Sequence, residues 1–162
     1  MDRRSLLTLL LCSYAFAQKP AVDYAQFVNP FIGSEGAIPG YAYGGGDVFV
    51  GAALPFGMVK LGLDTYEEPV NQSALNGGWT PKGYVTGISL LHVSGTGGGP
   101  KYGFPSQIPL TAIDGDVNIL DNRTYCQTRV GDDFASAGYF RTQFESGVST
   151  KLAASRHTGS SN

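Results

Sequence analysis

The chain has 162 residues, with 11 Lys and Arg against 13 Asp and Glu, and only 15% of its residues are charged. The length suits one domain, and without a basic stripe there is no electrostatic footprint of a nucleic-acid binder. A hydrophobic content of 42% is too high for a disordered chain. The 23 glycines are about twice the usual share, and nine prolines argue against long helices. Composition therefore favours a soluble, loop-rich, β-based protein.

The N-terminus has the features of a secretory signal peptide. Arg3 and Arg4 precede an apolar run over 6–17, which ends in Ala15-Phe16-Ala17, small residues of the kind found at a cleavage site. The run is too short to cross a bilayer, which needs about 20 helical residues. We therefore predict a signal peptide over 1–17, a domain over 18–162 and a secreted location. No later stretch is apolar enough to span a membrane.

Cleavage changes the cysteine count and places the chain where glycans are added. Cys12 would be removed with the signal peptide, so Cys126 would be the one cysteine of the mature chain and could form no intramolecular disulfide. We expect Cys126 to be buried as a small apolar residue. Two sequons, at Asn71 and Asn122, fit surface loops of a secreted chain, and we predict glycosylation at both.

Alternation of apolar and polar residues with period two indicates half-buried strands. The clearest are 59–64, 140–144 and 148–155. The last two are joined by Glu145-Ser146-Gly147, which predicts a three-residue hairpin with Gly147 in the left-handed conformation. Shorter apolar candidates are 88–93, 108–113 and 117–120. The expected fold class is an all-β, antiparallel β-sandwich.

The final predicted strand runs on through Gly159, and nothing after it would cover its new edge. We therefore expect an incomplete sandwich, whose edge pairs with another chain or whose sequence is a fragment of something longer. Such a chain would be marginally stable and prone to aggregate or dimerise.

Glycines cluster at 33–46, 77–78 and 95–103. They serve either as turn residues or as places where the backbone approaches a ligand closely. A phosphate loop is excluded over 95–101, because the segment lacks the Gly-Lys-Ser/Thr ending and no helical pattern follows it.

Five motifs, in order along nearly the whole chain, resemble glycoside hydrolase family 92, a family of exo-acting α-mannosidases. They are Val-Asn-Pro-Phe-Ile-Gly at 28–33, Gly-Ala-Ala-Leu-Pro-Phe-Gly-Met-Val at 51–59, His-Val-Ser-Gly-Thr-Gly at 92–97, Gly-Tyr-Phe at 138–140 and Ala-Ala-Ser-Arg-His-Thr-Gly at 153–159. The chain departs from the family pattern at Val50, Leu90 and Gly98.

The resemblance implies a two-domain enzyme. Its N-terminal domain is a galactose-mutarotase-like β-sandwich, and its C-terminal domain is an α/α helical barrel. The implied reaction is calcium-dependent, inverting hydrolysis of terminal α-mannose from N-glycans or mannans. Both catalytic carboxylates and the calcium ligands belong to the barrel, so this chain is expected to carry no catalytic or metal-binding residue and to be inactive alone. Its expected partners are a mannose-containing glycan and the missing catalytic domain. We expect no binding to nucleic acid and, after removal of the signal peptide, none to a membrane.

The acidic residues agree with that expectation, because no two of them stand out as an acid and a base. We expect Glu67-Glu68 and Asp132-Asp133 to be solvated. Asp114-Gly115-Asp116 is either a hairpin turn or a loose cation site, and Tyr125 stands where an EF-hand loop needs Glu. A catalytic serine is also disfavoured, because Ser94 lacks the Gly-x-Ser-x-Gly context.

Several residues are candidates for binding substrate. Trp79 would either stack on a sugar ring or anchor the core, and His92 is either a buried structural histidine or a hydrogen-bond donor near the sugar. Hydroxyls of Ser94 and Thr96, and the backbone at Gly95 and Gly97, complete the predicted set. We expect His157 and Arg156 to lie on a strand surface or between domains. Two functions stay open: a domain that contributes to the site of an α-mannosidase, or a non-catalytic, secreted carbohydrate-binding fragment. A gene-prediction artefact is a further possibility.

Overall fold

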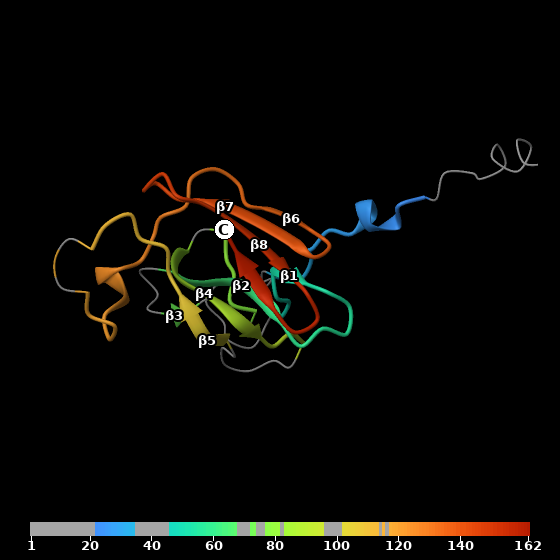
Figure 1. Ribbon diagram of the computed structural model, residues 1–162, viewed down its shortest axis with the longest axis horizontal. Coiled ribbons are helices and arrows are strands. Elements are labelled where there is room, and N and C mark those ends of the chain that lie inside the picture. The colour runs from blue at the N-terminus through green and yellow to red at the C-terminus, as the bar shows by residue number, and fades with distance from the viewer. Residues whose placement is uncertain are drawn as a thin grey trace, which may run out of the picture.

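Two antiparallel β-sheets, one above the other in Figure 1, make up the described part of the chain. The computed structural model describes residues 22–34, 46–67, 72–73, 77–81, 83–95, 102–113, 115 and 117–162. The predicted signal peptide, Asn71, Thr96, Gly97 and the two aspartates of the 114–116 motif lie outside these residues. The all-β sandwich predicted from the sequence is confirmed.

The first sheet has the order β1-β2-β4-β5, with the short β3 paired to β2. Its strands are β1 (Gly51–Ala53), β2 (Lys60–Glu67), β3 (Gln72–Ser73), β4 (Tyr84–His92) and β5 (Tyr102–Gln107). The second sheet has the order β6-β7-β8-β9. Its strands are β6 (Phe134–Ser136), β7 (Tyr139–Gln143), β8 (Ser149–Ala154) and β9 (Gly159–Ser161).

The hydrophobic core lies between the sheets. Leu61 and Leu63 of β2 belong to the same buried cluster as Phe140 of β7 and Leu152 of β8. On β7 and β8 the buried and exposed side chains alternate, so the period-two pattern places alternate side chains on the inner face. Sandwich cores are built this way from the inner faces of both sheets.

The predicted hairpin between β7 and β8 is confirmed. The N–H of Phe144 donates to the carbonyl of Val148 at 2.9 Å, and Gly147 donates back to Phe144 at 3.0 Å. Gly147 has φ +86°, the left-handed conformation expected of the glycine in a three-residue connection.

Two predicted strands are wrong. Residues 108–113 have no regular structure, and 117–120 form a turn before the short 3-10 helix η2 (Asn122–Thr124). The strand instead covers the less apolar residues of β5, which lies at the edge of the sheet and contains Pro105. A proline has no N–H for the ladder and is tolerated on an edge strand, whereas the apolar run after it contains Pro109 and finds no partner strand.

The final strand also differs from the prediction. β8 ends at Ala154, the chain turns over 155–158, and β9 comes back to pair with β8 in the register Leu152↔Ser161 and Ala154↔Gly159. Asn162 extends the ladder by exchanging two backbone hydrogen bonds with Lys151. The chain thus covers this edge of β8 itself, because a turn breaks the strand that the alternation pattern would have continued.

Helical structure in the described residues is limited to η1 (Tyr24–Phe27) and η2, both 3-10 helices with an aspartate at the N-cap. No helix in these residues is long and apolar enough to cross a bilayer. At η2, Arg123 donates to both carboxylate oxygens of the capping Asp121, at 2.8 Å each. This side-chain hydrogen bonding holds the pKa of the Asp121 carboxyl below its usual value.

Candidate functional site

Three segments far apart in the sequence meet along the first sheet: 46–49 before β1, 77–80 before β4, and 92–95 at the end of β4. The N–H of Gly77 donates to the carbonyl of Gly46, and the N–H of Gly95 donates to the carbonyl of Asp47, both at 2.9 Å. The first segment therefore bridges the other two. In this way the structure brings together four of the predicted site residues: Trp79, His92, Ser94 and Gly95.

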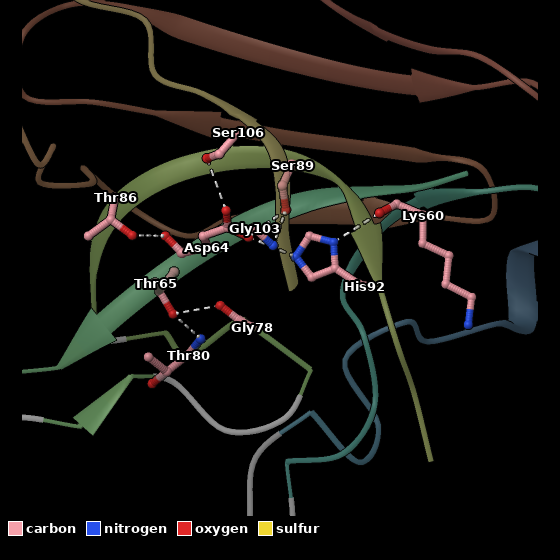
Figure 2. A network of polar contacts seen from close by, with 10 residues as sticks. All are labelled: Lys60, Asp64, Thr65, Gly78, Thr80, Thr86, Ser89, His92, Gly103 and Ser106. Carbon is pink, nitrogen blue, oxygen red and sulfur yellow. Dashed lines mark hydrogen bonds and ion pairs between the residues drawn. The ribbon is translucent and has the colours of Figure 1, made fainter. Parts of the chain in front are cut away.

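Gly78 allows segment 77–80 to lie directly on His92. A Cβ at position 78 would be 2.8 Å from Cδ2 and 2.9 Å from Nε2 of His92, closer than real side chains approach. Gly78 also has φ +86°, which L-residues rarely adopt. On its other side the segment is fixed by Thr65, whose hydroxyl donates to the carbonyl of Gly78 and accepts from the N–H of Thr80, both at 3.0 Å (Figure 2).

Trp79 points into the molecule, and 7% of its surface is exposed. Its indole N–H donates to the Asp133 carboxylate at 2.7 Å, and its ring packs against Phe31 at 5.1 Å between centroids. The guanidinium of Arg129 lies 5.8 Å from the indole centroid. Trp79 therefore anchors segment 77–80, and the part of it that stays accessible borders a cavity.

This cavity, of about 150 Å³, lies beside Trp79 and is lined by Phe31, Arg129 and the Asp132–Asp133 pair among others. Arg129 is almost fully buried: it pairs with Asp133 and donates to the carbonyls of Thr80 and Gly83. Its Nε has no hydrogen-bond partner among the described residues. Aromatic, cationic and carboxylate groups thus surround a small, partly polar hollow.

Asp133 corrects one prediction. We expected the Asp132-Asp133 pair to be solvated, but the Asp133 side chain is 4% exposed and accepts hydrogen bonds from Trp79 and Arg129. These partners lie 54 and 4 positions away in the chain, and only the fold brings Trp79 to the carboxylate. Asp132 is exposed, as expected.

His92 lies in a buried polar network on the face of the first sheet that is turned away from the second sheet (Figure 2). Its Nδ1 is 2.9 Å from the carbonyl of Lys60, which can only accept, so Nδ1 carries the hydrogen. Its Nε2 lies 3.1 Å from Oδ1 of Asp64, although no hydrogen bond of good geometry forms there. The ring packs against Tyr102 at 5.7 Å and Phe49 at 4.9 Å. Only 2% of the surface of His92 is exposed, so its role in the site is to support segment 77–80 by packing against Gly78.

Asp64 is the second member of this network, and the sequence analysis did not select it as a site residue. The Ser89 hydroxyl donates to its Oδ1 at 2.7 Å, and the Ser106 hydroxyl donates to its Oδ2 at 3.2 Å. Strand β2 was expected to be half-buried, yet Gly62 and Asp64 on its second face are buried too. The sequence did contain a sign that this face is covered, because it has glycines at positions 62 and 87. A Cβ at Gly62 would collide with Phe49, and a Cβ at Gly87 would collide with Ser106.

Ser94 and Gly95 lie at the outer end of the site. The Ser94 hydroxyl accepts from the N–H of Phe49 at 3.0 Å and is half-buried, so its own hydrogen can still be donated. Gly95 is exposed, with φ +75° and open space where a Cβ would stand. His157 and Arg156, expected on a strand surface or between domains, are exposed in the turn between β8 and β9, where the carbonyl of Arg156 accepts from the N–H of Met58 at 2.8 Å.

The described residues contain no group of three or more His, Cys, Asp or Glu side chains placed to hold a metal ion. Calcium prefers six to eight oxygen ligands, several of them carboxylates. The buried carboxylates of Asp64 and Asp133 are already taken up by hydroxyl, indole and guanidinium donors. The calcium that the family resemblance implies therefore does not fit the described part of this chain. Cys126 is half-buried and forms no disulfide there.

Comparison with known proteins shows the family to which the chain belongs. The chain matches the model of the "Glycosyl hydrolase family 92 N-terminal domain" over residues 27–162. It is 31% identical, over 157 residues, to a protein of Arthroderma benhamiae described as an uncharacterized secreted glycosidase, and the match covers 94% of this chain. The chain spans only 19% of the length of that relative. A secreted location, predicted from the N-terminal segment, agrees with this relative and is confirmed. This chain belongs to glycoside hydrolase family 92, as an N-terminal domain.

Proposed function

We propose that this domain forms part of the sugar site of a secreted, calcium-dependent exo-α-mannosidase that removes terminal α-mannose from N-glycans or mannans with inversion. The observation that carries the proposal is the convergence of segments 46–49, 77–80 and 92–95 in a chain of this family. Segment 92–95 offers a hydroxyl and exposed backbone, and segment 77–80 contributes Trp79 to the wall of a small cavity. A sugar needs polar groups of this kind beside an aromatic side chain.

The residues have different parts in this proposal. Ser94 donates its hydroxyl hydrogen to a sugar oxygen, and the backbone at Gly95 approaches the ring closely because no side chain intervenes. Trp79 borders the binding cavity with its accessible edge. His92 is a positioning residue, because its side chain is fully covered and supports segment 77–80 from below. Thr96 and Gly97, the remaining predicted residues, follow Gly95 directly in the sequence.

Inverting hydrolysis needs a carboxylic acid that protonates the leaving oxygen and a carboxylate that activates water, about 6.5–9.5 Å apart. In this proposal neither group belongs to the described residues. The buried carboxylates of Asp64 and Asp133 are hydrogen-bonded to protein donors and serve the structure. The acid, the base and the calcium ligands belong to the catalytic domain of the family enzyme. The domain alone is then inactive.

The surface for that catalytic domain is the exposed apolar turn between β1 and β2. Phe56 is fully exposed and has φ +58°, a conformation that is uncommon for a bulky residue and concentrates at functional sites. Met58 beside it is 75% exposed. The turn leads into Lys60, whose carbonyl accepts from His92, so this surface is continuous with the candidate site. The occupant we propose is the additional domain that the much longer relative has room for.

A chimera tests the proposal. In it, this chain replaces the matching segment of the Arthroderma secreted glycosidase, and the product is assayed with aryl α-mannosides and other aryl glycosides. We expect turnover of the α-mannoside, loss of turnover with a calcium chelator, and an anomer of inverted configuration by NMR. Ser94→Ala should raise KM, whereas Ser149→Ala on β8 should not. A folded, secreted chimera that cleaves only other glycosides, or none, would refute the proposal.

The cavity beside Trp79 favours the second candidate, a carbohydrate-binding fragment without catalysis. Because Trp79 is the only tryptophan, titration of the chain alone with mannose should shift its fluorescence in a saturable way. Galactose is the matched control sugar. Saturable binding by the isolated chain together with an inactive chimera would favour this candidate over the first.

A further inference from the structure

The segment around η2 and the turn between β1 and β2 lie at opposite ends of the first sheet (Figure 1). Apolar side chains are exposed around η2. Ile119 is 81% exposed and Leu120 is 91% exposed. Both line an open hollow of about 640 Å³ together with Tyr66 and Tyr125. Adjacent apolar side chains exposed in this way usually mark a surface that something covers.

Asn122 stands at the rim of this hollow and also at the rim of a second one. The second hollow, of about 200 Å³, is lined by Tyr66, Tyr84 and Cys126 among others. Asn122 is the first residue of η2, and its side-chain amide has no hydrogen bond to another described residue. A group attached to this amide would therefore start at the rim of two hollows that Tyr66 also lines.

The sequon Asn122-Arg123-Thr124 is held in an ordered surface turn. The Thr124 hydroxyl donates to the carbonyls of Asp121, at 2.8 Å, and Asn118, at 3.1 Å, and it accepts from the N–H of Asn118. Both Arg123 and Thr124 are exposed. The turn lies outside the sheets, so a bulky group on Asn122 displaces no part of the core.

We propose that Asn122 carries an N-linked glycan whose first N-acetylglucosamine lies in the hollow over Tyr66 and Leu120 and shields this apolar surface. The chain is secreted, so it passes the enzyme that transfers glycans to sequons. In that transfer Nδ2 of Asn122 bonds to C1 of the N-acetylglucosamine, and the C1–O bond to the lipid pyrophosphate donor breaks. The pyrophosphate leaves with the electron pair, and the amide loses one proton.

The chemistry of the hollow suits this occupant. A pyranose ring has apolar C–H faces that pack on tyrosine and leucine side chains, as sugars do on aromatic platforms. The hydroxyls and acetamide of the sugar meet the polar rim formed by Asp121 and Arg123, which also line the hollow. Without the glycan, Ile119 and Leu120 stay exposed and favour self-association.

Occupancy is tested on the full chain secreted from yeast. We expect the peptide that contains Asn122 to carry a glycan, N122Q to lose one glycan by intact mass, and T124S to keep it because serine also completes a sequon. N71Q is the matched control, since it leaves the Asn122 peptide glycosylated. A secreted, folded chain whose Asn122 peptide is unmodified would overturn the proposal.

Shielding is tested on the folded, glycosylated protein, which avoids variants that fail to fold. Endoglycosidase H leaves one N-acetylglucosamine on Asn122, whereas peptide N-glycosidase F removes all sugar and converts Asn122 to aspartate. We expect the first product to stay monomeric by analytical ultracentrifugation. The second, and N122Q without the added charge, should self-associate several-fold more, and L120S should reverse this. Equal association of all forms would overturn the shielding role.

Discussion

Replacing Gly78 by alanine tests the packing of segment 77–80 on His92. The new methyl group would lie 2.8 Å from Cδ2 of His92, 2.9 Å from its Nε2 and 3.2 Å from the carbonyl oxygen of Leu63. The histidine has little room to move, because Nδ1 is hydrogen-bonded to Lys60 and the ring packs against both Phe49 and Tyr102. We therefore expect Gly78→Ala to destabilise the domain.

The magnitude follows from a matched control at Gly147, which has the same φ of +86° but nothing within 4 Å of its would-be Cβ. Both variants lose about 1–2 kcal/mol for the left-handed conformation and regain about 0.4–1 kcal/mol from the less flexible unfolded chain. Only Gly78→Ala overpacks the interior, which costs about 1–3 kcal/mol more. For a chain of this size the difference is roughly 2–12 °C in melting temperature.

The assay is urea and thermal unfolding of both variants, followed by circular dichroism and by the fluorescence of Trp79. If Gly78→Ala and Gly147→Ala melt together, His92 moves aside freely and the argument from close packing is wrong. In the chimera proposed above, Gly78→Ala should also raise KM, because it displaces Trp79, while Gly147→Ala should leave KM unchanged.

Three further predictions concern ionic and aromatic groups. Arg129→Met leaves the buried Asp133 without its cation, so the free energy of unfolding should fall by about 3–5 kcal/mol. Arg123→Met, the control at an exposed pair, should hardly change the urea midpoint. Similar urea midpoints for the two variants would contradict this prediction. Trp79 should emit at short wavelength in the native state and shift to longer wavelength on unfolding, and a solvent-like native emission would show that it is exposed. Arg123→Gln should raise the pKa of Asp121 toward 3.8 in an NMR titration. Because the folded pKa is lowered, the contribution of Asp121 to stability is present above 3.8 and lost as the pH falls through the folded value. At this exposed pair that contribution is small, so the NMR titration and not the urea midpoint is the readout.

Local pattern was enough to predict the β7–β8 hairpin of the second sheet, whereas β6 and β9 were not predicted. The alternation over 140–144 and 148–154 reports which side chains share a face, and Gly147 supplies the left-handed turn that a three-residue hairpin needs. Both signals lie within a few residues of the structure they describe. For the same reason the pattern failed after Ala154, where a local turn returns the chain as β9.

The candidate site needed the fold. The sequence predicted Trp79, His92, Ser94 and Gly95 separately, and only tertiary hydrogen bonds bring their segments together. Asp64 is buried by serines 25 and 42 positions away, and Trp79 meets Asp133 across 54 positions. Alternation shows that two residues share a face of a strand, but not what covers that face. The sequence by itself therefore determined the all-β class, the β7–β8 hairpin and the family, while the tertiary structure decided which polar side chains are buried and paired, because their partners come from distant parts of the chain.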